Sequence, residues 1–99
     1  MFSLMEKVIL VTGGAHRVGR AVVLALAHEG AHVAFTYLSS KEEAMKTVEA
    51  ASALGVRAAA YACDQTDLKQ ISGVVDQVQM EFGRLDGLVN NASMMPETP

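Results

Sequence analysis

A glycine-containing turn near the start of the sequence carries the residues with the clearest chemistry. The apolar run 8–11 (Val-Ile-Leu-Val) leads into Thr12, Gly13 and Gly14, and Gly19 follows five residues later. The aliphatic run predicts a strand buried on both faces, and the glycines let the chain reverse without Cβ clashes. A helical apolar pattern comes next, so the N-terminus of that helix should face the turn. Its free N–H groups and positive dipole end favour a pyrophosphate there.

The motif Thr12-Gly13-x-x-x-Arg17-x-Gly19 differs from the common dinucleotide fingerprint Gly-x-Gly-x-x-Gly. It resembles the TGxxxGxG motif of the short-chain dehydrogenase/reductase family, with arginine in place of the middle glycine. Within that family, the TGxxxRxG form is similar to the pteridine reductases and their relatives, which use NADPH. The resemblance implies that Arg17 pairs with the pyrophosphate or the 2′-phosphate of the cofactor. The alternative is a solvated residue in the first turn of the helix.

Two neighbours of Arg17 fall in the same predicted cofactor-binding turn. Val18 stands between Arg17 and Gly19. His16 has the chemistry to hydrogen-bond a phosphate, with an exposed turn residue as the equal alternative. The turn therefore contributes five candidates, which are Gly13, His16, Arg17, Val18 and Gly19.

A second candidate cluster ends the second predicted strand, about 20 residues beyond the turn, where dinucleotide-binding folds meet the adenosine ribose. Residues 36–40 read Thr-Tyr-Leu-Ser-Ser and include no Asp or Glu. An acidic residue would bind the 2′-hydroxyl of NAD and repel a 2′-phosphate, so its absence favours NADP, with NAD the weaker choice. Ser39 and Ser40 are candidates to meet the phosphate, and Tyr37 to flank the adenosine. Ser40 has an alternative role as a helix cap, because Ser40 and Glu43 have capping-box spacing.

Two further clusters follow later strands. The resemblance implies that Asp64 contacts the adenine amino group, whereas Asp67 or Thr66 should cap the next helix. The run 90–93 (Asn-Asn-Ala-Ser) looks like the family's NNAG with serine for glycine. Of its two amides, Asn90 is the better candidate to tie neighbouring strands together. The cofactor's ribose and nicotinamide side would then meet Asn91, Ala92 and Ser93.

The elements that must position these residues alternate between strand and helix. We expect strands over residues 8–11, 32–37, 57–63 and 87–91, and helices that follow residues 19, 40 and 67. The first helix should bury Val18, Ala21, Val22, Ala25 and Leu26, and the second Ala44, Val48, Ala51 and Leu54. This β-α-β-α-β-α-β order predicts an α/β fold of the Rossmann type, with a doubly wound parallel sheet in the family's strand order 3-2-1-4.

Composition narrows the classes of partner. The chain has 99 residues, a net charge of −3 and a single cysteine, Cys63. We expect one domain over residues 1–99, an incomplete NAD(P)-binding unit. The charge balance, without a basic run, argues against nucleic acid, and no apolar stretch suggests a membrane span or a leader, so a cytoplasmic location is expected. A lone cysteine supports no disulfide framework, and His28 and His32 have no clustered partner that would suggest a metal.

The resemblance spans residues 12–93 and implies an NADPH-dependent oxidoreductase that transfers hydride to a carbonyl or pterin-like small molecule. It covers only the first part of a family member, and the family's catalytic Ser and Tyr-x-x-x-Lys belong to a later region, so we name no catalytic residue. The spacing does recur at Tyr37 and Lys41. That pair falls on the adenosine side, too far from the reacting atom for proton transfer.

Three alternatives remain open from the sequence. In the first, the chain is the cofactor-binding part of a reductase that forms homo-oligomers at full length. In the second, it is a nucleotide-binding regulatory module without catalysis. In the third, it is an assembly fragment whose fourth strand is an open apolar edge.

Overall fold

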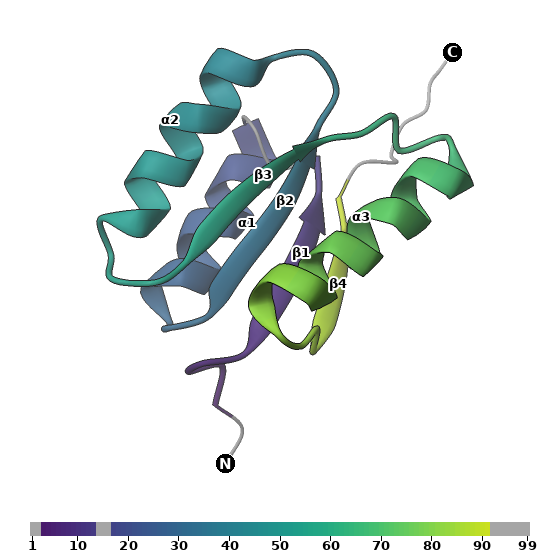
Figure 1. Ribbon diagram of the computed structural model, residues 1–99. Coiled ribbons are helices and arrows are strands. Elements are labelled where there is room, and N and C mark those ends of the chain that lie inside the picture. Colours follow the sequence, from purple (N-terminus) through teal and green to yellow (C-terminus); the bar gives the residue numbers. More distant parts are fainter. Residues whose placement is uncertain (1–2, 14–16, 92–99) are drawn as a thin grey trace.

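The computed structural model describes residues 3–13 and 17–91 and confirms the predicted alternation of strands and helices (Figure 1). Half of the strand ends agree with the predicted ranges and the other half differ by one residue. In chain order the elements are β1 (Val8–Thr12), α1 (Arg17–His28), β2 (His32–Tyr37), α2 (Lys41–Ser52), β3 (Ala58–Ala62), α3 (Leu68–Phe82) and β4 (Gly87–Asn90).

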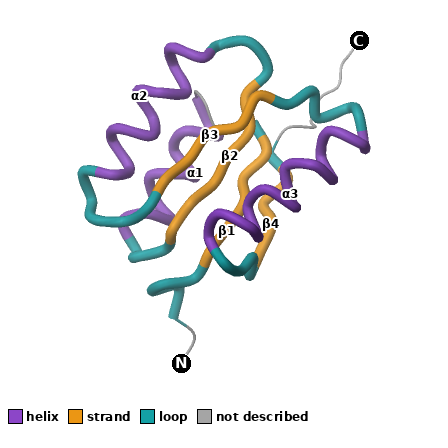
Figure 2. The backbone as a smooth tube through the Cα atoms, in the orientation of Figure 1, coloured by secondary structure: helices purple, strands orange, loops and turns teal. Residues whose placement is uncertain are grey.

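The four strands form one parallel sheet in the order β3-β2-β1-β4, as predicted (Figure 2). Strand β1 lies in the middle, and its Leu10 pairs with Ala34 of β2 and with Leu88 of β4. Strand β4 lies at one edge of the sheet, where Leu88 is 56% exposed. The carboxyl ends of all four strands therefore meet at a single end of the sheet, which is where doubly wound folds bind ligands.

Helices cover both faces of the sheet, with α1 and α2 on one face and α3 on the other (Figure 1). Because side chains alternate along a strand, Ile9 and Val11 pack with α1, whereas Val8 and Leu10 pack with α3. All four are buried, which confirms the prediction that this strand is covered on both faces.

The predicted apolar stripe of α1 is wrong by one residue. The buried positions are Gly19, Val23 and Ala27. Of the predicted positions, Val22 and Leu26 pack against the core, while Val18, Ala21 and Ala25 are exposed. A shift of one residue rotates a helix face by about 100°. Hydrophobic residues surround most of this helix, so their spacing alone did not determine the buried side.

Helix α2 follows its predicted pattern more closely. In α2, Ala44 and Ala51 are buried and Val48 packs against the same core, but Leu54 lies beyond the helix and is 46% exposed. Helix α3 ends at Gly83, whose φ of 84° is left-handed, as expected for a glycine after a helix.

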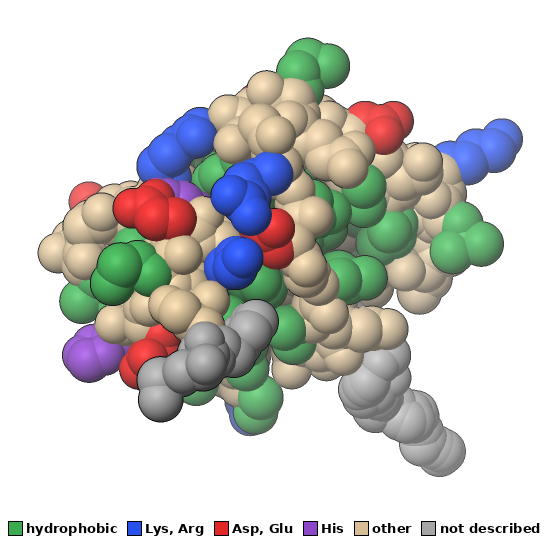
Figure 3. Space-filling model, turned by 90° about the horizontal axis from the view of Figure 1, so that it is seen from below, with side chains coloured by type: hydrophobic (Ala, Val, Ile, Leu, Met, Phe, Trp, Pro, Cys, Tyr) green, Lys and Arg blue, Asp and Glu red, His purple; other side chains and the backbone are tan. Residues whose placement is uncertain are grey.

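The amino end of the sheet is held by charged and polar side chains that bond to the next strand. His32 accepts a hydrogen bond from the Arg57 N–H at 3.0 Å and contacts Glu6 at 2.9 Å. Asp86 accepts from the Val8 N–H at 2.8 Å and pairs with Arg84. Seen from this end, acidic and basic side chains lie next to one another (Figure 3). These groups act as connectors between strands.

Among the described residues, no helix has the length and apolar character needed to cross a membrane.

Candidate ligand pocket at the carboxyl end of the sheet

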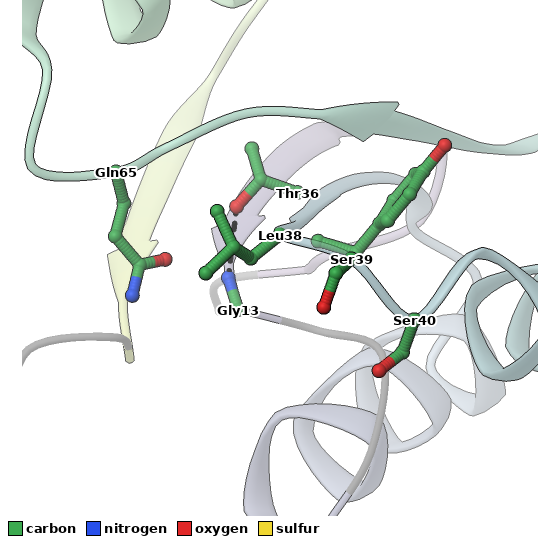
Figure 4. Close-up of a pocket in the computed structure, with 7 residues that line it drawn as sticks. Gly13, Thr36, Leu38, Ser39, Ser40 and Gln65 are labelled. Atoms are coloured by element: carbon green, nitrogen blue, oxygen red, sulfur yellow. Dashed lines mark hydrogen bonds between the residues drawn. The ribbon is translucent and has the colours of Figure 1, made fainter.

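A pocket of about 310 Å³ opens at the carboxyl ends of β1 and β2, beside the loop that follows β3. Its wall is made of backbone, hydroxyl, amide, aromatic and aliphatic groups, and none of the described residues that line it is charged. Two of the four clusters predicted to bind the cofactor at the carboxyl ends of the strands, the glycine turn and the end of β2, contribute to it (Figure 4). The lining residues are Gly13, Thr36, Tyr37, Leu38, Ser39, Ser40 and Gln65.

Gly13 is fixed in place by hydrogen bonds from both sides. Its N–H donates to the Thr36 hydroxyl oxygen at 2.9 Å, drawn as a dashed line in Figure 4, and its carbonyl accepts from the Asn91 side-chain amide at 3.1 Å. Its φ is 74°, a conformation that glycine adopts without steric cost. Gly13 therefore uses both of its main-chain polar groups within the protein.

Gly19 is required by the close approach of α1 to this turn. A Cβ added at Gly19 would lie 1.8 Å from the Gly13 carbonyl oxygen and 2.9 Å from the Asn91 amide nitrogen. No side chain fits in that space. The glycine at this position therefore lets the beginning of α1 pack directly on the end of β1.

Arg17, the first residue of α1, adopts a φ of 56°. This left-handed conformation favours glycine and costs another residue about 1–2 kcal/mol. The structure thus explains why glycine suits the middle position of the motif. Arginine at this position has to adopt a left-handed backbone conformation, which costs conformational free energy. The side chains of Arg17 and Val18 are both exposed.

The two serines line the pocket together (Figure 4). Ser40 occupies the N-cap position of α2 but makes no side-chain capping hydrogen bond, so the predicted capping box is wrong. Its φ of −90° and ψ of 66° depart from the usual β-region geometry of a capping residue. The Ser40 hydroxyl is therefore not used by the cap and can meet a ligand. Tyr37 also lines the pocket, and Lys41 is exposed at the beginning of α2.

Asp64 lies just beyond β3 and has its carboxylate oriented by Thr66. One carboxylate oxygen accepts from the Thr66 hydroxyl at 2.7 Å and from the Thr66 N–H at 3.0 Å. These hydrogen bonds hold the pKa of the Asp64 carboxyl below its usual range, so it is ionised at neutral pH. Asp67 caps α3 by accepting from the N–H groups of Lys69 and Gln70, which confirms the predicted cap.

Sequence reasoning missed three residues of the pocket, namely Thr36, Leu38 and Gln65. Thr36 and Leu38 fell within a region that was singled out for its serines and for its lack of acid. Gln65 follows Asp64 directly, so its position after β3 was the available signal.

The two asparagines at the carboxyl end of β4, Asn90 and Asn91, both connect this strand to β1. The Thr12 hydroxyl lies 3.1 Å from the Asn90 side-chain oxygen, and the Asn91 N–H donates to the Thr12 hydroxyl at 3.1 Å. Asn91 thus shares the structural role that was assigned mainly to Asn90. The candidates His16, Ala92 and Ser93 lie outside the described residues.

Within residues 3–13 and 17–91, no three His, Cys, Asp or Glu side chains form a group able to hold a metal ion. Cys63 is buried in the core beneath α3, and burial raises the pKa of its thiol. The chemistry of the pocket is that of neutral hydrogen-bonding groups around a backbone turn.

Residues 7–99 match the family model of the short chain dehydrogenases. A curated relative, the 3-oxoacyl-[acyl-carrier-protein] reductase of Staphylococcus aureus, is 41% identical over 90 residues, which are 91% of this chain and 37% of that protein. The chain therefore spans little more than a third of the length of this relative.

Two solved structures resemble the fold closely and differ in cofactor. An NAD⁺-bound xylitol dehydrogenase has a TM-score of 0.86 and 36% identity, over 94% of this chain and 35% of its own. A putative dehydrogenase from Burkholderia cenocepacia with bound NADP has a TM-score of 0.85 and 33% identity, over 89% of this chain and 34% of its own. Neither likeness determines which cofactor this chain prefers, and the likeness to pteridine reductases is not confirmed.

Proposed function

The chain belongs to the short-chain dehydrogenase family, and we propose that it forms the NADPH-binding portion of a reductase within that family. The proposed unit is a single incomplete Rossmann domain over residues 1–99. Its substrate class is a small molecule with a carbonyl or a pterin-like ring, in a cytoplasmic protein that forms homo-oligomers at full length. NADPH supplies the hydride when bound, whereas the residues of this chain hold and orient it.

The observation that carries the proposal is the uncharged, hydroxyl-rich pocket at the end of β2. Tyr37, Ser39 and Ser40 lie in its wall, and none of its lining residues within the described part of the chain is acidic. A carboxylate here would repel a 2′-phosphate, so the pocket suits the phosphorylated ribose better than an acidic one would. The Ser40 hydroxyl, which makes no capping bond, adds a donor for that phosphate.

The fit of a diphosphate to the turn has its own structural support. The beginning of α1 packs against Gly13 because Gly19 has no side chain, which brings the first N–H groups of the helix to the end of β1. Such groups, together with the helix dipole, favour an anion. Arg17 adds a positive charge at the first position of the same helix. These residues are the proposed holders of the diphosphate and the 2′-phosphate, with Asp64 proposed for the adenine and Asn91 for the nicotinamide ribose.

Binding of NADPH and NADH to the wild-type chain and to Arg17→Ala, measured by isothermal titration calorimetry, tests this proposal. We expect Arg17→Ala to weaken NADPH binding by about 1–3 kcal/mol, the range for a charged hydrogen bond, and NADH binding by less. Lys46→Ala, which removes an exposed positive charge from α2, is the matched control and should change neither affinity.

Equal losses for both cofactors in Arg17→Ala would mean that Arg17 does not distinguish the 2′-phosphate. Failure of the wild-type chain to bind either cofactor would contradict the proposed function as a whole.

A further inference from the structure

Thr36, at the carboxyl end of β2, is fully buried, yet its hydroxyl lines the pocket wall through its bond to the glycine turn. We infer that Thr36 is a positioning residue: its hydroxyl sets the path of the turn after β1 and thereby the affinity for ligands that carry a diphosphate. The inference rests on the proposed function, because it concerns the same site.

The first argument comes from the register of the sheet. The last paired residues of β1 and β2 are Val11 and Phe35, so Thr36 lies one residue beyond that register. Its hydroxyl oxygen accepts the Gly13 N–H at 2.9 Å and continues the connection between these strands past the backbone pairing. The Thr36 side chain thus fixes the position of the backbone where β1 ends and the turn begins.

The second argument comes from the other contacts of Gly13. Its carbonyl oxygen accepts from the Asn91 amide at 3.1 Å and lies where a Cβ of Gly19 would be. The Gly13 peptide groups are therefore held between β2, β4 and α1. Thr36 provides the only one of these contacts, among the described residues, that engages the Gly13 N–H.

The consequence concerns which N–H groups remain for an anion. Because Thr36 accepts the Gly13 N–H, that group points into the protein and is not available to a bound diphosphate, which leaves the first N–H groups of α1. Losing the hydroxyl would free the Gly13 N–H and leave this peptide unit without its orientation. A partly buried N–H without an acceptor also favours rotation of the peptide toward water.

Valine at this position keeps the branched shape of threonine and removes the acceptor, whereas serine keeps the acceptor and removes a methyl group. Thr36→Val and Thr36→Ser therefore separate hydrogen bonding from packing. Thr47→Val is the matched control, because Thr47 is also a fully buried threonine with a hydrogen-bonded hydroxyl, located on α2.

The experiment measures dissociation constants of NADPH, ADP and adenosine for the 99-residue chain and these three variants. Amide hydrogen exchange at Gly13 is followed by NMR in parallel. We expect Thr36→Val to bind NADPH and ADP at least about fivefold more weakly, the equivalent of one hydrogen bond, with adenosine unchanged. Exchange at Gly13 should accelerate in Thr36→Val, and Thr36→Ser and Thr47→Val should resemble the wild type in both readouts.

Wild-type affinity of Thr36→Val for ADP would overturn the inference. So would an equal loss for ADP and adenosine, because it would mean that Thr36 supports the pocket in general. A wild-type chain that binds neither ADP nor NADPH would instead contradict the proposed function. The Gly13 exchange rates would still show, in that case, whether the Thr36 hydroxyl holds the turn.

Discussion

The two ends of the parallel sheet use polar residues in opposite ways. At the amino end, charged and polar side chains bond near the beginnings of neighbouring strands, as Asp86 does with the Val8 N–H at 2.8 Å and His32 with the Arg57 N–H at 3.0 Å. At the carboxyl end, Ser40 stands at a helix N-cap without capping it and faces a pocket. Charged residues thus serve structure at one end, whereas uncharged hydroxyl groups form a binding surface at the other.

The contrast teaches that charge alone is a poor guide to function in this chain. Arg57 stacks over the Phe82 ring, 4.5 Å from its centroid, and donates to the Glu81 carbonyl oxygen at 2.7 Å, so its charge is used in packing. Among residues 3–13 and 17–91, the pocket wall contains no charged residue. A polar group that bonds to the rest of the protein has a structural role, whereas a polar group that faces the pocket is available to bind a ligand.

The largest expected effect lies at the carboxyl end and comes from Gly19→Ala. The added methyl group would lie 1.8 Å from the Gly13 carbonyl oxygen, so we expect the free energy of unfolding to fall by about 3 kcal/mol. Cofactor binding should be lost with it. Urea unfolding followed by circular dichroism measures the change. Gly73→Ala in α3 is the control: its Cβ meets nothing within 4 Å, and it should stabilise the helix by about 1 kcal/mol. An unchanged stability of Gly19→Ala would contradict the close packing described here.

A smaller effect is expected from Tyr61→Phe in β3, a substitution away from the pocket. The Tyr61 hydroxyl donates to the Glu81 carboxylate, and its loss should cost about 1 kcal/mol in urea unfolding at pH 7. Burial, followed by this hydrogen bond, raises the pKa of Tyr61 well above its usual value. The unfolded tyrosine ionises near pH 10, before the folded one, so wild-type stability should fall as the pH rises above about 10.

Tyr61→Phe should lack that alkaline component of the pH dependence. Tyr37→Phe, at the pocket, is the comparison: it should keep the alkaline component due to Tyr61 and change cofactor affinity instead. If both variants alter binding and neither alters the alkaline slope, the division between the two regions is wrong.

Arg17→Gly should change stability and binding in opposite directions. Glycine relieves the left-handed φ of 56°, so we expect a net gain of about 0.5 kcal/mol after the greater flexibility of the unfolded chain is counted. Loss of the guanidinium should weaken NADPH binding. Thermal unfolding and calorimetry on the same preparations measure both quantities. A loss of stability would mean that the Arg17 side chain supports the fold.

The smallest effects are expected at low pH, from one aspartate at each end of the sheet. Hydrogen bonds from Thr66 lower the pKa of Asp64, and hydrogen bonds from Arg84 and the Val8 N–H lower that of Asp86. Each contributes stability above the unfolded value of about 3.9 that is lost as the pH falls through the lowered folded pKa. Asp64→Asn and Asp86→Asn should each reduce the acid dependence of unfolding, and only Asp64→Asn should weaken NADPH binding. A binding defect in Asp86→Asn would contradict the structural role of the amino end.

Much of the fold could be predicted because its signals are local. The aliphatic run before Gly13 and the capping aspartate Asp67 each specify a boundary or a buried strand through neighbouring residues. The buried face of α1 was not predictable in this way, because Val18, Ala21 and Val23 are all compatible with burial by residue type. Only contact with the sheet selects Val23.

The candidate site shows the same limit. The serines after β2 were identified from their place in the sequence, but the role of Ser40 was misassigned because capping spacing does not ensure capping geometry. The residue types of Thr36 and Gln65 do not point to a ligand, and their only signal was their place at the end of a strand. They reach the pocket because parallel strands from distant parts of the chain end side by side.

The bonds that join Thr12 and Gly13 to the two asparagines connect residues that are 78 or 79 positions apart. During synthesis on a ribosome, the first strand and helix emerge long before their partners Asn90 and Asn91, at the end of β4, have been translated. The turn therefore cannot form all of these hydrogen bonds until residue 91 has been translated. Contacts this distant in sequence slow folding, because a long loop has to close first. The region that we propose to bind the nucleotide would then be among the last parts of the described chain to become rigid.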